Sequence, residues 1–378
     1  GDVYKRQRQH YATFQRMLEG MDVRVAILTG ASKARERREA LAGIADGSID
    51  LLIGTHALIE DRVQFSNLGF VVIDEQHRFG VEQRARLWTK NEQPPHILVM
   101  TATPIPRTLA MTLYGDLDVS VIDELPPGRQ PIRTVHYTDA ARLRLFGFMR
   151  QEIKKGRQIY VVYPLIKESE TMDYKDLQDG YEAISRDFPL PEYVTTICHG
   201  KMKPEDKEES MRQFKSGEAN IMVATSVIEV GVDVPNATVM VIESAERFGL
   251  SQLHQLRGRV GRGSQQSYCI LMSGEKLSKE ARLRLEAMCE TNDGFRLAEL
   301  DLKLRGAGDV NGTLQSGMAF DLKIANPTLD SQILTVTREA AAEVLTADPT
   351  LTQNGHEGLR ELRKRYSGRE EIDFSQIS

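Results

Sequence analysis

The chain has 378 residues, of which 40% are hydrophobic and 27% are charged, and its formal net charge at pH 7 is −5. This balance is ordinary for a globular protein. It does not favour nucleic-acid binding and does not exclude it, because one basic groove on an acidic protein is enough to bind phosphates. No apolar run approaches the roughly 20 residues that span a bilayer, and the cysteines at 198, 269 and 289 lack metal-ligand or pairing spacing, which is typical of reduced thiols in a cytoplasmic protein.

The first third of the chain contains four short apolar runs that predict β-strands: RVAIL (24–28), DLLIG (50–54), FVVID (70–74) and HILVM (96–100). Helical periodicity at 33–46 and 81–88 separates them. Runs that are apolar throughout, without alternation, predict strands buried on both faces of a parallel sheet. The proline-rich segment DELPPGRQP (123–131) then predicts a linker.

The same pattern restarts after the linker, which predicts a second α/β sheet of the doubly wound type. Helical patterns at 139–155 and 204–216 lie among six further apolar runs: IRTVHY (132–137), QIYVVY (158–163), YVTTIC (193–198), NIMVA (220–224), TVMVIE (238–243) and SYCILM (267–272). Residues 276–304 predict two charged amphipathic helices broken at Asn292, Asp293 and Gly294. A glycine-rich segment (305–317) and a polar helical tail follow.

Two adjacent carboxylates, Asp74 and Glu75, follow directly on an apolar strand. Ligands of open α/β sheets bind at the carboxyl ends of the strands, and like charges in contact are costly unless a cation lies beside them. We therefore expect Mg²⁺ near Asp74 and a water activated by Glu75. A solvated strand end with two surface acids is the alternative, since acidic pairs in turns are common.

Two further stretches carry residue types that suit a nucleotide. Thr101 and Thr103 follow the strand 96–100, where hydroxyl groups can hydrogen-bond the neighbouring carboxylates; a capped turn is the alternative. In HQLRGRVGRG (254–263), three arginines are spaced by glycines. Arginine forks bind phosphate oxygens and glycine permits close backbone approach, although the same residues also fit a basic surface helix.

The order DEQH (74–77), TAT (101–103) and QLRGRVGRG (255–263) resembles motifs II, III and VI of superfamily 2 helicases. The longer forms DEQHRFGVEQR and TATPIPRTLA resemble the RecG family of bacterial DNA helicases, which remodel replication forks and junctions. Further stretches are similar to motifs Ib, IV and V and to a segment shared with the transcription-repair coupling factor: LLIGTHALI (51–59), QIYVVYPLI (158–166), ATSVIEVGVDVPNA (224–237) and NDGFRLAELDLKLRGAGDVNGTLQSG (292–317).

The resemblance implies two RecA-like parallel-sheet domains, the first one truncated (1–125 and 126–275), and a third segment (276–378) with a helical hairpin, a translocation loop and C-terminal helices. It implies ATP and Mg²⁺ as cofactors, branched double-stranded DNA as partner, and a monomeric protein of the bacterial cytoplasm associated with the nucleoid and not with a membrane. The implied catalytic residues are Asp74, which would hold Mg²⁺ through water, Glu75, Gln255, Arg259 and Arg262. Nucleotide sensing falls to Gly231, Asp233 and Thr101, and DNA binding or coupling to Thr55, Thr101, Thr103, His199, Gly200, Thr225, Arg305 and Gln315.

The sequence departs from the family pattern at one point: it contains no G-x-x-x-x-G-K-[ST] phosphate loop. RQHYATFQ (8–15) resembles the end of motif Ia, so we expect a fragment whose partner is the missing N-terminal part of the same protein, including the wedge domain. Because backbone N–H groups and a lysine of this loop hold the phosphates, we expect these residues alone to be inactive as an ATPase. Two alternatives are a transcription-repair coupling translocase and a non-catalytic nucleic-acid-binding module.

Overall fold

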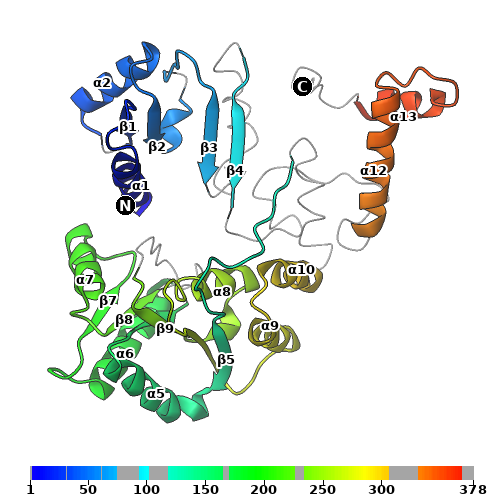
Figure 1. The fold of residues 1–378 in the computed structure, drawn as a ribbon. Helices are drawn as coiled ribbons and strands as arrows, with labels where there is room; N and C mark the ends of the chain where they lie inside the picture. The colour runs from blue at the N-terminus through cyan, green and yellow to red at the C-terminus, as the bar shows by residue number, and fades with distance from the viewer. Residues whose placement is uncertain are drawn as a thin grey trace.

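The structure is a computed structural model that describes residues 2–30, 32–60, 62–74, 93–101, 118–164, 170–225, 234–305 and 331–367. All ten predicted strands are present in it. Figure 1 shows the strands of the first part (residues 2–101) in blue and cyan, and those of the second part (residues 132–305) from teal through green to yellow. The linker predicted at 123–131 contains neither helix nor strand.

In the first part, the strands form two parallel pairs, β1 with β2 and β3 with β4, which are not joined into one sheet among the described residues. The expected helix 33–46 is confirmed as α2, whereas the expected helix 81–88 lies outside the described residues. The elements are α1 (Asp2–Met17), β1 (Val25–Leu28), α2 (Ala34–Ala45), β2 (Leu51–Gly54), η1 (His56–Leu58), β3 (Phe70–Asp74) and β4 (His96–Met100).

The expectation of burial on both faces is wrong for β3 and β4. On one face of this pair, Ile73 of β3 packs with Ile59 in a small apolar cluster. The other face leaves Phe70, Val72 and Leu98 between 46% and 59% exposed. An apolar run predicts an extended strand, but burial of its second face depends on what packs against it, which a single strand's sequence does not contain.

The second part is one parallel sheet of six strands in the order β5-β10-β9-β6-β8-β7. The strands are β5 (Arg133–Thr138), β6 (Gln158–Tyr163), β7 (Thr195–Cys198), β8 (Ile221–Thr225), β9 (Ala237–Ile242) and β10 (Tyr268–Ser273). The helices around them are η3 (Asp139–Ala141), α5 (Arg142–Lys154), α6 (Glu170–Asp187), α7 (Pro204–Ser216), η5 (Ala245–Arg247), α8 (Leu250–Arg257), α9 (Lys279–Glu290) and α10 (Gly294–Arg305). The doubly wound prediction is confirmed.

Both faces of this sheet are buried, because successive side chains of a strand point to opposite faces. Ile159 and Val161 of β6 pack with Leu145 and Phe146 of α5 and with residues of α6 on one face. Tyr160 packs with Phe214 of α7 and with the leucines of α8 on the other. Each such fully buried side chain contributes about 1.5–3 kcal/mol, so this core is the most stable element of the described structure.

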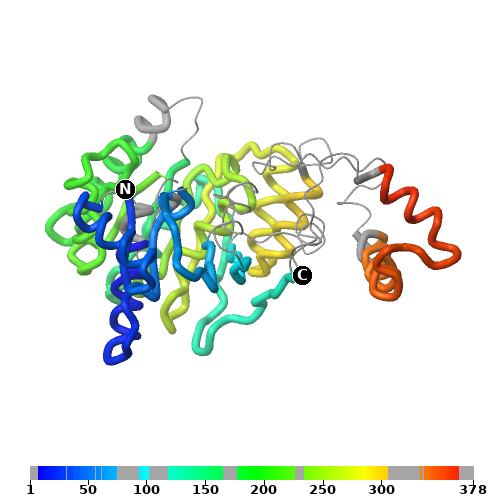
Figure 2. The backbone as a smooth tube through the Cα atoms, turned by 90° about the horizontal axis from the view of Figure 1, so that it is seen from above, coloured from blue at the N-terminus to red at the C-terminus, as the bar shows by residue number. Residues whose placement is uncertain are grey.

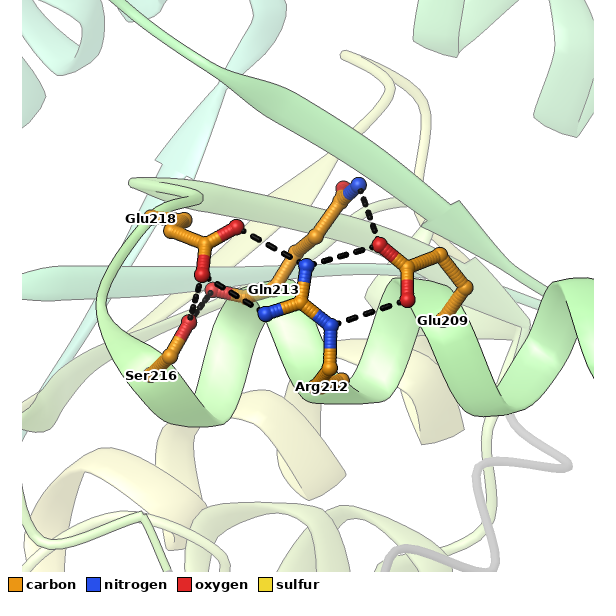
Figure 3. A network of polar contacts seen from close by, with 5 residues as sticks. All are labelled: Glu209, Arg212, Gln213, Ser216 and Glu218. Atoms are coloured by element: carbon orange, nitrogen blue, oxygen red, sulfur yellow. Dashed lines mark hydrogen bonds and ion pairs between the residues drawn. The ribbon is translucent and has the colours of Figure 1, made fainter.

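The helix α7 has the bounds that its sequence predicts, because Pro204 starts it and Gly217 ends it in a left-handed conformation (φ 83°). In its last turns, Arg212 binds Glu209 of the same helix at 2.8 and 2.9 Å and Glu218, just beyond the end of the helix, at 2.7 and 3.0 Å (Figure 3). This charged cluster lies where the chain enters β8, at the amino ends of the strands. It therefore fixes the α7–β8 turn and is far from the edge where parallel sheets bind ligands.

The two helices predicted within 276–304 are confirmed as α9 and α10. They are separated where predicted, and Asp293 Oδ1 accepts a 2.8 Å hydrogen bond from the N–H of Phe295 at the start of α10. Leu285, Met288 and Leu297 belong to the same core cluster as α7 and α8. The helices α12 (Ser331–Ala347) and α13 (Glu357–Ser367) lie to one side of this core in both views (Figures 1 and 2).

Candidate active site

The carboxyl ends of β2, β3 and β4 carry three of the predicted residues. Asp74 ends β3 and is paired in register with Met100, so Thr101 lies one residue beyond it on the adjacent strand. Thr55 follows β2 and its carbonyl accepts a hydrogen bond from Leu58 N at 2.9 Å, which starts the turn η1. The two expected partners Glu75 and Thr103 lie outside the described residues.

Gly54, the last residue of β2, lets the chain pass close to β1 just before Thr55. A Cβ atom at this position would lie 2.3 Å from the carbonyl oxygen of Leu28 and 2.8 Å from Cγ of Leu58. Only glycine therefore lets the end of β2 approach β1 so closely. Thr55 is held at the carboxyl edge of this pair by backbone packing, which is the placement that a ligand-binding residue of a parallel sheet requires.

In the second part, the residues predicted to meet DNA come from two adjacent strands. His199 and Gly200 follow β7, and Thr225 is the last residue of β8. Cys198 pairs in register with Ala224, so His199 and Thr225 are the next residues on neighbouring strands. The structure therefore brings these predicted residues to one point of the carboxyl edge. Gly231 and Asp233 lie outside the described residues.

The side chains of His199 and Thr225 at this point of the carboxyl edge are both uncharged near pH 7. Burial, and then the nearby charges of Lys201 and Lys207, lower the pKa of His199 below its ordinary value, so its ring is neutral near pH 7. Thr225 is fully buried, and its Oγ1 atom has no hydrogen-bond partner within the described residues. A buried hydroxyl at a strand end is a polar group that a ligand oxygen or a neighbouring loop can satisfy.

The helix α8 places its polar residues on different sides. Gln255 is exposed, whereas Leu250, Leu253 and Arg257 are buried at helical spacing on the core side. Beyond the helix, Arg259 and Arg262 are half-buried in residues 258–263, which we call the arginine loop. Gly261 in this loop has a φ of 77°, a conformation that favours glycine. Gln255 and the two loop arginines are thus placed together at the end of α8.

Arg257, the first arginine of the motif, has a different place from Arg259 and Arg262. Its side chain is 2% exposed, and its guanidinium donates to the carbonyl oxygens of Met288 (3.0 Å), Thr291 (2.8 Å) and Asn292 (3.3 Å). It therefore satisfies the carbonyl group of Met288 in the last turn of α9 and those of Thr291 and Asn292 in the turn between α9 and α10. Its other amino group lies 3.1 Å from Nδ1 of His254. Burial, and then the charge of Arg257, lower the pKa of His254 to about 4.

A second acid at a strand end, missed in the sequence, lies in the second part. Glu243 follows β9 and is buried, and Arg142 of α5 binds both of its oxygens at 2.7 and 2.9 Å. The pair lines a cavity of about 370 Å³ together with Tyr163, Ser244 and Arg247, among others. The signal for Glu243 is the one that identified Asp74, an acid directly after an apolar run, but here an arginine neutralises it.

Arg305 ends α10, whereas Gln315 lies outside the described residues. Within the described residues, no group of three or more His, Cys, Asp or Glu side chains is arranged to hold a metal ion. A magnesium ion bound through water to the single carboxylate of Asp74 needs no such group. None of the described helices combines the length and the apolar composition that a membrane span requires.

Three family models match the chain in succession. The model of DEAD/DEAH box helicases matches residues 7–112, and the model of the helicase conserved C-terminal domain matches residues 142–264. The model of the C-terminal part of domain 3 of the ATP-dependent DNA helicase RecG matches residues 291–378. The first two matches coincide with the two α/β parts, and the third begins at the α9–α10 turn that Arg257 holds.

Curated relatives agree with these models over nearly the whole chain. The ATP-dependent DNA helicase RecG of Synechocystis is 50% identical and aligns with 95% of this chain and 42% of its own length. The RecG of Bacillus subtilis is 49% identical, with 90% and 49% covered, and that of Escherichia coli K12 is 46% identical, with 95% and 52% covered. The chain thus spans about half the length of the curated relatives it matches.

Solved structures also match most of the chain. A structure of RecG bound to a three-way DNA junction is 43% identical, with a TM-score of 0.66 over 87% of this chain and 42% of that one. A structure of the helicase MrfA bound to DNA and AMPPNP has a TM-score of 0.56 over 79% of this chain and 47% of that one, at 15% identity. The latter likeness shows a shared fold.

Proposed function

The chain belongs to the RecG family of DNA helicases, and we propose that it forms the motor part of an ATP-dependent double-stranded DNA translocase. Such a motor remodels stalled replication forks and Holliday junctions by pulling duplex arms. The relatives named ATP-dependent DNA helicase RecG and the relative bound to a three-way junction support this proposal. Its structural support is the collection of predicted residues at the carboxyl edges of the strands.

The first part supplies the acidic half of the nucleotide site in this proposal. Asp74, at the end of β3, would hold Mg²⁺ through water, and Glu75 next to it is the base that orients and deprotonates the attacking water. Mg²⁺, when bound, neutralises the charge of the transferring phosphate. Thr101, one residue beyond Asp74 on the adjacent strand, is placed to respond to the state of the nucleotide.

The second part supplies the basic half. Arg259 and Arg262 in the arginine loop would stabilise the charge that develops on the transferring phosphate, and Gln255 at the exposed end of α8 contacts the same phosphate. Gly231 and Asp233 serve as nucleotide sensors. In Figure 1 the carboxyl ends of β3 and β4 point toward the side of the second part where α8 lies, which is the single observation that carries this division of labour.

DNA contacts in this proposal come mainly from uncharged groups at strand ends: Thr55, Thr103, His199, Gly200 and Thr225. Arg305 and Gln315 would couple the nucleotide state to movement along the duplex. Hydroxyl groups, a neutral imidazole and backbone N–H groups bind phosphate and sugar oxygens and do not read the base sequence. We therefore expect DNA binding that is independent of base sequence. Its dependence on salt then comes from charged residues that meet phosphates, such as Arg305, because only these release counterions.

The proposal is tested by DNA-stimulated ATP hydrolysis in two polypeptides. The 378 residues alone, which contain no phosphate loop, are expected to show no measurable turnover. The same residues joined behind the phosphate-binding part of a RecG relative are expected to hydrolyse ATP when forked DNA is added. No stimulation of the joined protein, despite correct folding by circular dichroism, would contradict the motor proposal.

Single substitutions in the joined protein assign the roles. Glu75→Gln is expected to abolish turnover and to leave nucleotide binding intact. Arg259→Ala is expected to lower the turnover rate by roughly 10³–10⁵, the contribution typical of an arginine finger. Arg282→Ala, which removes an exposed arginine of α9, is the matched control and should change turnover less than about twofold, as surface substitutions usually do. Equal losses in the Arg259 and Arg282 variants would remove the finger assignment.

A non-catalytic nucleic-acid-binding module is the second candidate. Under this alternative, the joined protein binds DNA without turnover, and Glu75→Gln changes nothing. The same pair of assays therefore separates the two functions.

A further inference from the structure

The end of the linker is bound to the segment that joins the arginine loop to β10. The amide Nε2 of Gln266 donates to the carbonyl oxygen of Pro131 at 2.9 Å, and the N–H of Arg133 donates to the carbonyl oxygen of Ser267 at 3.0 Å. Between these two bonds, the side chain of Ile132 packs against the core of the second part. We call Pro131, Ile132, Gln266 and Ser267 the linker anchor.

Ile132 also contacts the arginine loop directly. A Cβ atom at Gly261 would lie 2.9 Å from Cγ1 and 3.0 Å from Cδ1 of Ile132, closer than side chains tolerate. Because Gly261 has no Cβ atom, the side chain of Ile132 can pack directly against the backbone there. The position of each residue therefore depends on the position of the other. Any displacement of Ile132 leaves a space beside Gly261, which lies between the two arginines of the loop and directly precedes Arg262.

The loop is held on its other sides as well. Val260 is 2% exposed and belongs to the core cluster that includes α8. A Cβ atom at Gly263 would lie 3.2 Å from the carbonyl oxygen of Pro235, so that end of the loop is also close to its neighbour. Because packed interiors compress little, a loop supported on several sides transmits a shift at one support to the others.

The linker itself has little to hold it before it reaches the anchor. Ile122 is 92% exposed and Leu125 is 55% exposed. Figure 1 shows this segment in teal, reaching the second part beside α8 before it continues into β5. A pull by the first part on the linker is therefore borne at Pro131 and Ile132, where the chain becomes the edge strand of the sheet.

The geometry points to a positioning role for the linker anchor: it sets the place of Arg259 and Arg262 and transmits the pull of the linker to them. This inference rests on the proposed function, because it assumes that the loop arginines act on the transferring phosphate. A misplacement of a reacting or stabilising group by about 1 Å costs roughly 10²-fold in rate. Movement of the two parts relative to each other would then change the rate through the anchor.

The first test measures the loop itself, by hydrogen exchange of the full chain with peptides that cover residues 258–263. Ile132→Ala is expected to speed exchange there about tenfold, as local opening becomes easier, whereas Ile132→Val should stay within about twofold. The matched control is Ile153→Ala, which removes an equally half-buried isoleucine from the opposite face of the sheet. Exchange in the loop that is unchanged in Ile132→Ala, or equally faster in Ile153→Ala, overturns the anchor.

A second pair of variants avoids any loss of core packing. Gln266→Glu replaces the amide that donates to Pro131 with a carboxylate that cannot donate, and Gln265→Glu makes the same charge change at the adjacent exposed residue. Exchange in the loop is expected to rise severalfold in the first variant only. Equal exchange in the two variants overturns the role of Gln266.

Turnover of the joined protein separates this inference from the proposed function. Ile132→Ala and Gln266→Glu are expected to lower kcat by about 10- to 100-fold with the KM for DNA unchanged, and Ile132→Val should restore most of the rate. Faster exchange with unchanged kcat supports the anchor and overturns the catalytic role of the arginines. Unchanged exchange with reduced kcat overturns the anchor and leaves the catalytic role standing.

Discussion

The β3–β4 pair of the first part and the β8–β9 strands of the second part have similar sequences and different surroundings. FVVID and HILVM are as apolar as NIMVA and TVMVIE. Val72 of β3 is nevertheless 50% exposed, whereas Val223 of β8 and Val239 of β9 are fully buried. The second sheet carries α5 and α6 on one face and α7 and α8 on the other, whereas the described residues cover one face of β3–β4. Apolar composition thus predicts the strand, and neighbouring elements decide its burial.

The comparison has a consequence for stability. Because the hydrophobic contribution is proportional to the area removed from water, the six-stranded sheet should unfold last and the β3–β4 pair should open at much lower free energy. The following experiments test this difference, beginning with the one whose expected effect is largest.

Phenylalanines in the two parts give the largest contrast. Phe214→Ala removes a fully buried ring that packs on Tyr160, with ring centroids 4.7 Å apart, and is expected to cost about 3–5 kcal/mol. Phe70→Ala removes a ring that is 59% exposed and should cost less than about 1 kcal/mol. Hydrogen exchange of peptides from β8 and from β3 measures both. A cost above about 2 kcal/mol for Phe70→Ala would show that its face is covered in solution.

Arg257→Ala is expected to cost about 3 kcal/mol, because it leaves one carbonyl group in the last turn of α9 and two in the α9–α10 turn without their charged donor. Urea unfolding followed by circular dichroism measures the loss. Arg257→Lys keeps the charge but cannot reproduce the guanidinium geometry, so it should lose more than half as much. An alanine variant as stable as the unsubstituted chain would mean that water replaces the arginine, and that the α8–α9 connection is weak.

Acid should weaken the second part through His254. Its pKa is about 4 in the folded protein and near its ordinary value of about 6.5 when unfolded, so the unfolded state binds more protons between these values. Stability is complete above pH 6.5 and falls toward pH 4 by up to about 1.4 kcal/mol per pH unit for this group. His254→Gln keeps an acceptor for Arg257 and removes the titration.

The slope in the His254→Gln variant should be smaller but not zero, because burial also lowers the pKa values of His136 and His199. Urea midpoints measured at half-unit steps of pH provide the data. An unchanged slope in the variant would mean that His254 is solvated in the folded protein.

Surface ion pairs should give the smallest effects and should not distinguish the two parts. Arg35→Ala in the first part removes a 2.8 Å pair with Glu39 on α2, which is expected to contribute about 0.3–0.5 kcal/mol. Arg212→Ala in the second part removes the cluster of Figure 3, and because this arginine binds two glutamates, its loss is expected to be larger than that of Arg35→Ala. Both losses should shrink in 1 M salt. A salt-independent loss for Arg212→Ala would point to a role beyond the ion pairs.

Local sequence was sufficient to predict the ten strands and the bounds of α7, because apolar runs, Pro204 and Gly217 act within a few residues. It was not sufficient for the open face of β3–β4, which depends on contacts far apart in the chain. It also grouped Arg257 with the phosphate-binding arginines, because glycine spacing says where the backbone can approach and not where each side chain points. The helical stripe Leu250, Leu253 and Arg257 was the available signal for its burial.

For the candidate site, the sequence predicted where some of the residues lie and not which partners they have. The placement of Asp74 and Thr101 at strand ends followed from apolar runs that stop at polar residues, whereas Thr55 was named through the resemblance alone. The structure has all three at strand ends. Their chemical roles remain proposals, as do those of Glu75 and Gly231, which lie outside the described residues. The pairing of Glu243 with Arg142 required the fold, because 101 residues separate the two partners.

The hydrogen bonds from Arg257 to the last turn of α9 and to the α9–α10 turn determine how far the polypeptide can be shortened. A recombinant product that stops after β10, near residue 275, would lose all three carbonyl acceptors between Met288 and Asn292, and it would lose Leu285 and Met288, which pack into the same core as α8. Arg257 would lose its hydrogen bonds and apolar surface of the core would be exposed to water, and both losses are destabilising. The shortest soluble version of the second part should therefore extend to the end of α10, and the boundary of its gene fragment belongs after the codon for Arg305.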